Sequence, residues 1–267
     1  MTMKTCARRL TEEEKQQYRE RGYVKNLPVF DEASVAELQS GFDHLLSLMP
    51  EGSDINLVNN WHKANRWFYD LCRTPEILDY VEDLLGPDFF QWGGQFFCKL
   101  PGMTSEVPWH QDAQYWPLTP HDTVTVWLAF YDSDEENGAM RVVAGSHEAG
   151  MFDHDTIEGD ENVLDQSIDA SRFSPDDVVT IDLKAGEISL HDDRLIHGSN
   201  ASTSGRRRVG LTMRFSPTHV KCDLSVWPTF ESYLARGEDR HGHNPVGEVP
   251  TGDGYPVQRF QQSTDFA

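Results

Sequence analysis

His110, Asp112 and His197 are residue types that hold divalent metal ions. Two imidazoles and one carboxylate bind one face of a mononuclear non-heme iron(II) ion and leave the opposite face open for a co-substrate and oxygen. His110 and Asp112 are two positions apart, so on an extended strand both side chains would point the same way. His197 must then come from a facing strand, which suits a rolled β-sheet. Because a His-x-Asp pair often occurs by chance, the surrounding sequence has to decide the matter.

The chain of 267 residues is long enough for one domain with a substantial core, since 38% of its residues are hydrophobic and 11% are aromatic. It contains no apolar run near 20 residues, and no apolar segment follows the charges at its start, so neither a transmembrane span nor a secretory signal is expected. Its four cysteines share no close spacing. We therefore expect free thiols and a cytoplasmic protein.

Charge narrows the range of partners. The net charge is −21, from 44 acidic and 23 basic residues. Such a surface repels the phosphates of nucleic acids and anionic membranes, so neither is an expected partner. The expected partner is a small-molecule substrate, and a homodimer is compatible with the sequence. Net charge does not identify the substrate, because a local basic pocket can lie inside an acidic shell.

The order of elements predicts an all-β core with a helical flank. Thr11 and Glu14 form a capping box, apolar residues recur at helical spacing after Asp31, and Thr74-Pro75 begins a third helix that ends at Gly86-Pro87. From Pro87 the pattern changes to short β-type runs. We predict a single domain with a helical flank over 1–87 and a core over 88–217. A lid insertion is expected at about 144–177, and 218–267 is expected to form an irregular extension.

Several short motifs around these residues occur in an order that is typical of one family. They are Lys99-Leu100-Pro101-Gly102, Trp109-His110-Gln111-Asp112, Tyr115-Trp116-Pro117-Leu118, Trp127-Leu128-Ala129, Glu136-Asn137-Gly138-Ala139-Met140, Ala144-Gly145-Ser146-His147 and the block from His197 to Arg208. Together they span roughly residues 60 to 217 and resemble the phytanoyl-CoA dioxygenase family of iron(II)- and 2-oxoglutarate-dependent oxygenases. The resemblance implies a double-stranded β-helix, or jelly roll, with the N-terminal helices packed on one sheet.

The resemblance also implies roles for individual residues. His110, Asp112 and His197 correspond to the iron ligands. Arg208, eleven residues after the second histidine, corresponds to the arginine that grips the distal carboxylate of 2-oxoglutarate, which a planar guanidinium can bind with two hydrogen bonds. Ser199 is expected to add a hydrogen bond there. The remaining residues implied for the co-substrate cavity are Trp127, Trp116 and Lys99.

Each of these roles has an alternative. Trp127 lies in an apolar strand and could be a core residue, whereas Arg206 and Arg207 are expected to be surface charges. His191, six residues before His197, is the rival metal ligand. We favour a hydrogen-bonding or core role for it, because the Gly-Ser pair after His197 matches the ligand position of the family. The neighbouring pair Asp192-Asp193 is expected to be a solvated turn, and His147 is expected to fix a loop.

The substrate is expected to be read at the mouth of the cavity. The candidates for contacting it are His62, Lys63, Arg66, Gln95, Gln114 and Tyr115. The basic cluster among them hints at an anionic group such as a carboxylate or phosphonate, with a basic surface helix as the alternative. An evident basic patch for the nucleotide of coenzyme A is lacking. An amino acid, a phosphonate or a secondary-metabolite intermediate is therefore expected rather than an acyl-CoA.

The resemblance implies an oxygenase that uses Fe(II), 2-oxoglutarate and O2 to hydroxylate an aliphatic C–H bond and releases succinate and CO2. Relatives that transfer halogen lack the carboxylate ligand, so the presence of Asp112 argues for hydroxylation or another oxidative outcome such as desaturation. Two other classes are open. A non-oxidative cupin-like isomerase, hydrolase or lyase would have no use for Arg208, and a ligand-binding module would be favoured if a metal ligand were missing.

Overall fold

The computed structural model describes residues 3, 5, 8–103, 105–156, 164 and 166–256. Its α-helices are α1 (Glu12–Arg21), α2 (Glu32–Leu48), α3 (Arg66–Leu71) and α4 (Pro75–Leu85). None of the described helices is long and apolar enough to cross a membrane.

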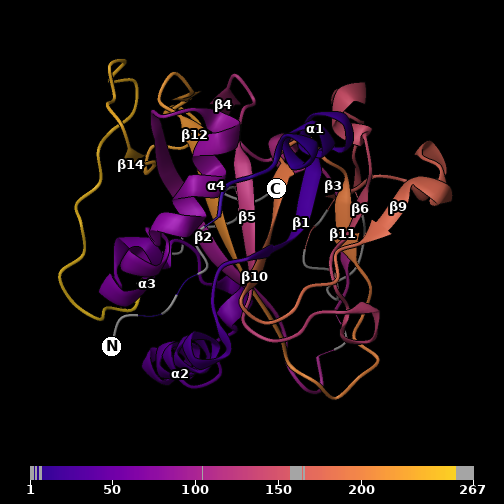
Figure 1. Ribbon diagram of the computed structural model, residues 1–267, viewed down its shortest axis with the longest axis horizontal. Coiled ribbons are helices and arrows are strands. Elements are labelled where there is room, and N and C mark those ends of the chain that lie inside the picture. Colours follow the sequence, from indigo (N-terminus) through magenta and orange to yellow (C-terminus); the bar gives the residue numbers. More distant parts are fainter. Residues whose placement is uncertain are drawn as a thin grey trace.

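The core consists of two antiparallel sheets. Within the described residues, the larger sheet has the strand order β1 (Tyr23–Pro28), β10 (Glu187–Asp192), β5 (Val124–Ala129), β12 (Arg208–Pro217), β2 (Phe89–Lys99) and β14 (Tyr233–Arg236). The smaller sheet has the order β3 (Val107–His110), β11 (His197–Ser199), β6 (Arg141–Val143) and β9 (Val178–Thr180). Short pairs join β4 (Leu118–Thr119) to β13 (Lys221–Cys222), and β7 (Asp155–Thr156) to β8 (Gln166–Ser167). The predicted jelly-roll core with a helical flank is confirmed (Figure 1).

Alternate residues of the larger sheet face different layers. On β12, Val209, Leu211, Met213 and Phe215 belong to the main hydrophobic core, which also contains Leu38, Phe42 and Leu45 of α2 and Ile77 and Val81 of α4. On the opposite face, Trp127 and Ala129 of β5 pack with Met140 and Val142 from the region of the smaller sheet. Side chains alternate along a strand, so successive residues face opposite layers. One face of the larger sheet packs against the helices, and the other face packs toward the smaller sheet.

The predicted helix boundaries are largely confirmed. Thr11 and Glu14 form the capping box of α1, and Gly22 ends this helix in the left-handed conformation with φ 78°. Pro75 is the first residue of α4 and Gly86 follows its last. Thr74 is the N-cap residue of α4, as predicted, but its hydroxyl donates to the carbonyl oxygen of Leu71 instead of accepting from the first turn of the helix.

The division into a helical flank, a β core and an irregular tail is too simple in two places. Tyr23–Pro28, inside the predicted helical flank, forms edge strand β1, and Tyr233–Arg236, inside the predicted irregular extension, forms the opposite edge strand β14. Both are short, and an edge position tolerates Pro28 because one side of an edge strand needs no ladder hydrogen bonds. Part of the predicted lid insertion, 157–163 and 165, lies outside the described residues, so its role stays a prediction.

Candidate metal centre and co-substrate cavity

The three predicted metal ligands lie together between the two sheets. His110 ends β3 and is the direct register partner of His197 on the neighbouring strand β11. The ring centroids of these histidines are 4.1 Å apart. Oδ1 of Asp112 lies 3.7 Å from Nε2 of His110 and 4.0 Å from Nε2 of His197. One ligand atom from each of the three residues lies within 4.8 Å of the others.

Two details of this cluster differ from the expectation. His197 lies on the strand next to β3 in the same sheet, not on a facing strand. Asp112 is not on the strand either, because β3 ends at His110 and Asp112 begins a short 3-10 helix, η3 (Asp112–Gln114). The 3-10 turn still brings the carboxylate to both imidazoles.

Backbone carbonyl groups fix the orientation of both histidines. Nδ1 of His110 lies 2.8 Å from the carbonyl oxygen of Pro108, and Nδ1 of His197 lies 2.9 Å from that of Leu195. In each case the carbonyl oxygen can only accept, so Nδ1 carries the proton and Nε2 is left with its lone pair. This is the arrangement that metal-binding histidines usually have, with the second ring nitrogen held by a hydrogen bond.

The electrostatics of the cluster favour the forms that bind metals. Burial opposes ionisation of Asp112, but the proximity of His110, His197 and Arg214 holds the pKa of this carboxyl well below its usual range. Burial, followed by His110, lowers the pKa of His197. A carboxylate and a neutral imidazole are the required ligand forms. The donor set therefore suits a divalent ion with open coordination positions, as in mononuclear iron(II) sites.

His191, the rival ligand, lies beside the cluster but not in it. Its ring centroid on β10 is 5.0 Å from that of His197, and its side chain lines the same cavity. Among the described residues, neither ring nitrogen has a hydrogen-bond partner. Burial lowers its pKa to about 4, so its ring is neutral at pH 7. The residues whose ligand atoms converge are the predicted three.

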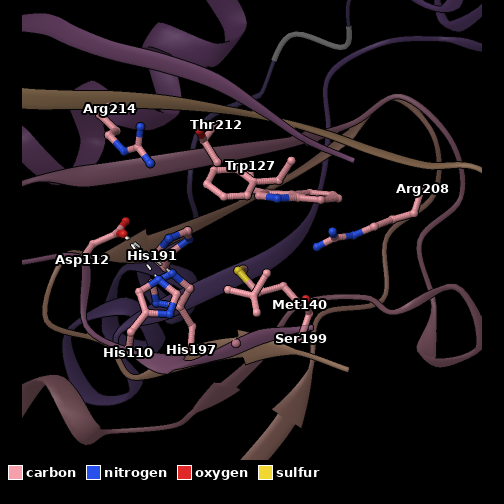
Figure 2. A pocket seen from close by; sticks show the side chains of 13 residues that line it. His110, Asp112, Trp127, Met140, His191, His197, Ser199, Arg208, Thr212 and Arg214 are labelled. Atoms are coloured by element: carbon pink, nitrogen blue, oxygen red, sulfur yellow. Dashed lines mark ion pairs between the residues drawn. The ribbon is translucent and has the colours of Figure 1, made fainter. Parts of the chain in front are cut away.

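A cavity opens beside these ligands, and its free space together with the solvent at its mouth is about 400 Å³. Figure 2 shows the ligands at one end of it and Arg208 at the other, with Trp127 between them and Met140 and Ser199 on the opposite wall. Trp127 therefore lines the cavity in addition to packing in the core between the sheets.

Arg208 is a buried cation without an ion-pair partner among the described residues. Among the described residues, Nε of Arg208 has no hydrogen-bond partner, and no carboxylate lies within ion-pair distance of its guanidinium. Burial lowers its pKa to about 10, which leaves the group charged at pH 7. Oγ of Ser199, on the same cavity, also has no partner among the described residues. A buried unpaired guanidinium is costly unless an anion joins it, so this end of the cavity suits the carboxylate of a ligand.

Lys99 and Trp116, also predicted for this cavity, are not among the described residues that line it. Lys99 is 2% exposed, and its Nζ donates hydrogen bonds to the carbonyl oxygens of Ser105 and Asn200. Burial, followed by the neighbouring Arg208, lowers its pKa to about 7. Trp116 is one layer away and contacts the guanidinium of Arg214, which itself lines the cavity.

The residues predicted to read the substrate lie elsewhere, with one partial exception. His62 is buried against Tyr233, and Lys63 pairs with Glu231 at 3.0 Å. Arg66 pairs with Asp70 one turn along α3, which agrees with the alternative of a basic surface helix.

Nε2 of Gln95 donates to the carbonyl oxygen of Asn56, and the side chain of Gln114 is exposed. None of these five residues is among the described residues that line the cavity, since four of them contact other partners and Gln114 is exposed. Tyr115 is the exception, since its ring lies 6.1 Å from that of His110.

Sequence reasoning missed Thr212 and Arg214, which line the cavity from β12. Both follow Arg208 at even spacing on a predicted strand, so the two-residue period of a strand could have found them. It also misjudged Asp193, which lies in a turn but is fully buried rather than solvated. Arg206 and Arg207 form exposed ion pairs, as expected. A ring nitrogen of His147 hydrogen-bonds to the carbonyl oxygen of Arg19, which holds the loop of His147 to α1.

Comparison with known proteins agrees with this geometry. Residues 18–210 match the family model described as phytanoyl-CoA dioxygenase (PhyH). The mouse peroxisomal phytanoyl-CoA dioxygenase is 29% identical over 70% of this chain, but the match covers only 56% of that protein. A probable alpha-ketoglutarate-dependent hypophosphite dioxygenase of Stutzerimonas stutzeri is 24% identical over 93% of both chains.

Solved structures give the same picture. The non-heme monooxygenase ThoJ in its apo form superposes with a TM-score of 0.74 at 25% identity, covering 89% of this chain and 88% of that one. CytC3 with Fe(II) and alpha-ketoglutarate has a TM-score of 0.69 at 20% identity, covering 92% and 96%, and shows the same fold. From its family match, its fold and its His-Asp-His cluster, the chain belongs to the phytanoyl-CoA dioxygenase family of iron(II)- and 2-oxoglutarate-dependent oxygenases.

Proposed function

We propose that this protein is an oxygenase that uses iron(II), 2-oxoglutarate and O2 to hydroxylate an aliphatic C–H bond of a small polar metabolite. The observation that carries the proposal is that one cavity contains both the convergent His110, Asp112 and His197 and the unpaired guanidinium of Arg208. A metal site alone would suit many reactions, whereas a buried cation on the same cavity adds a place for the carboxylate of a co-substrate.

In this proposal the three ligands hold iron(II) through Nε2 of each imidazole and a carboxylate oxygen. Arg208 and the hydroxyl of Ser199 would bind the distal carboxylate of 2-oxoglutarate, and Trp127 would form a wall of its site. When bound, the metal and co-substrate supply the oxidising power for attack on a C–H bond, with release of succinate and CO2. The protein aims the substrate and keeps water out of the cavity.

The lining of the cavity supports a small polar substrate. We place the co-substrate and the reacting part of the substrate in this one cavity, whose walls include Arg208 and Arg214. An amino acid, a phosphonate or an intermediate of secondary metabolism is compatible with this charged lining. The hypophosphite in the name of the Stutzerimonas stutzeri relative is likewise a small polar molecule.

Anaerobic titration of the iron(II)-loaded protein with 2-oxoglutarate tests the proposal. Chelation by the co-substrate should produce a weak visible charge-transfer band that saturates, and in Arg208→Gln the same band should require much more 2-oxoglutarate. Substrates can then be screened by succinate release. Iron binding without any such band would contradict the proposal and favour a non-oxidative metal enzyme.

We also propose the cytoplasm as the compartment in which the protein acts. Cys72, Cys98 and Cys222 are free and buried, and unpaired thiols are typical of reducing compartments. Cell fractionation tests this assignment, and recovery of the protein from a secreted or membrane fraction would contradict it.

A further inference from the structure

We propose that Arg214 is the substrate-recognition residue of this cavity and that it binds an oxyanion, a carboxylate or a phosphonate, on the substrate. The inference rests on the proposed function, because it assigns Arg208 to the co-substrate. It replaces the expectation that His62, Lys63 and Arg66 form the anion site, since those residues are engaged away from the cavity.

Arg214 is a second buried cation in the same cavity. It is 9% exposed, and among the described residues its Nε has no hydrogen-bond partner and its guanidinium has no ion-pair partner within 4.0 Å. The carboxylate of Asp112 interacts electrostatically with Arg214, but this carboxylate is a proposed iron ligand. Once Asp112 is bound to the metal, Arg214 is left without a compensating anion.

The surrounding residues hold this side chain in place. Its guanidinium carbon lies 5.0 Å from the ring centre of Trp116 and 5.9 Å from that of Trp92. On β2, a Cβ at Gly93 would lie 2.9 Å from Cδ of Arg214, so this glycine makes room for the arginine stem. A guanidinium packed beside two aromatic rings keeps its planar fork in one orientation and loses little entropy when an oxyanion binds.

The positions of the two arginines separate two anion sites. Arg208 and Arg214 are six residues apart on β12, which corresponds to roughly 20 Å of strand. Figure 2 shows Arg214 on the side of Asp112, and Arg208 beyond Trp127. A five-carbon diacid that chelates the metal and reaches Arg208 does not also occupy Arg214. Arg214 therefore remains for an anionic group on the second ligand, the substrate.

The test measures ternary binding without requiring the natural substrate. Anaerobic protein loaded with iron(II) and saturated with 2-oxoglutarate is titrated by calorimetry with methylphosphonate and, separately, with propionate; propionamide serves as the neutral control. Tryptophan fluorescence is followed in parallel, because Trp92 and Trp116 contact Arg214. We expect at least one of the two oxyanions, but not the amide, to bind beside 2-oxoglutarate.

Variants separate charge, geometry and folding. Arg214→Gln should weaken oxyanion binding at least about tenfold while leaving the 2-oxoglutarate band intact. Arg214→Lys keeps the charge without the fork and should fall between wild type and Arg214→Gln, so it decides the matter if Arg214→Gln does not fold. Arg206→Gln, which removes an exposed arginine paired with Asp134, is the matched control and should behave as wild type.

Four results would overturn the inference: failure of both oxyanions to bind, binding that occurs only without 2-oxoglutarate, unchanged binding in both Arg214 variants, or loss of the 2-oxoglutarate band in Arg214→Gln. The last would place Arg214 in the co-substrate site. Absence of the band in wild type contradicts the proposed function instead. In that case, oxyanion binding that depends on Arg214 would still be recorded in the calorimeter.

Discussion

The guanidinium carbon of Arg208 lies 5.3 Å from the ring centre of Trp127. Thr212 of β12 is the register partner of Trp127 on β5. Gly210 lies two residues before Thr212, and because it has no side chain it leaves space for the indole ring. A Cβ at Gly210 would lie 1.9 Å from Cζ2 of Trp127. The orientation of the ring beside Arg208 thus depends on the absence of a methyl group on the adjoining strand.

Gly210→Ala should therefore destabilise the protein and disturb the co-substrate site. Forcing a methyl group against a packed ring costs about 1–3 kcal/mol, so the free energy of unfolding from denaturant titration should fall by that amount. Gly205→Ala is the matched control, because a Cβ there meets nothing within 4 Å. Equal midpoints for the two variants would show that the Trp127 ring moves aside at no cost.

Arg208→Gln should raise the dissociation constant for 2-oxoglutarate by about 100-fold, since two hydrogen bonds between charged groups are lost. Iron content should stay at the wild-type level, because Arg208 is remote from the ligand atoms. The chelate band measures the constant directly. Arg206→Gln controls for the loss of a positive charge, and an unchanged constant in Arg208→Gln would refute the co-substrate assignment.

Asp112→Ala should weaken iron(II) binding by more than about 100-fold, which exceeds the usual effect of removing a residue that only supports a ligand. His191→Ala should retain one equivalent of iron, because His191 lies beside the ligand cluster without joining it. Metal analysis after desalting distinguishes the two variants. Iron retained in Asp112→Ala and lost in His191→Ala would exchange their roles.

Asp193 should make stability depend on pH. Burial and the adjacent Asp192 raise the pKa of its carboxyl to about 8. Because the folded pKa lies above the unfolded value, the folded state binds more protons between about pH 4 and 8, and the free energy of unfolding contributed by Asp193 falls as pH rises through this window.

The test of this dependence is the neutral variant Asp193→Asn. Its stability advantage over wild type should grow by up to about 1.4 kcal/mol per pH unit between pH 5 and 8, as measured by denaturant unfolding. A constant difference between the two proteins over that range would mean that the buried carboxyl is ionised throughout.

What the sequence predicts well depends on local chemistry. His110, Asp112 and the helix caps are recognisable because their residue types recur at short fixed spacings, although Asp112 reaches the site from a 3-10 turn and not from the expected strand. The burial of His62 and Asp193 cannot be predicted from neighbouring residues, because it depends on strands and segments that are far away in sequence. Edge strands β1 and β14 are missed for the same reason, since each is short and becomes a strand only when it pairs with a sheet already formed.

Strand β12 divides its residues between two tasks. Its odd positions from Val209 to Phe215 are core residues against the helices, and its even positions Arg208, Thr212 and Arg214 face the cavity. A mutation at 212 or 214 can therefore change which molecule is accepted without opening a void under the helices. During evolution, substitutions on the cavity face of β12 can change the substrate, whereas substitutions on its helix face are limited by the need to keep the core packed.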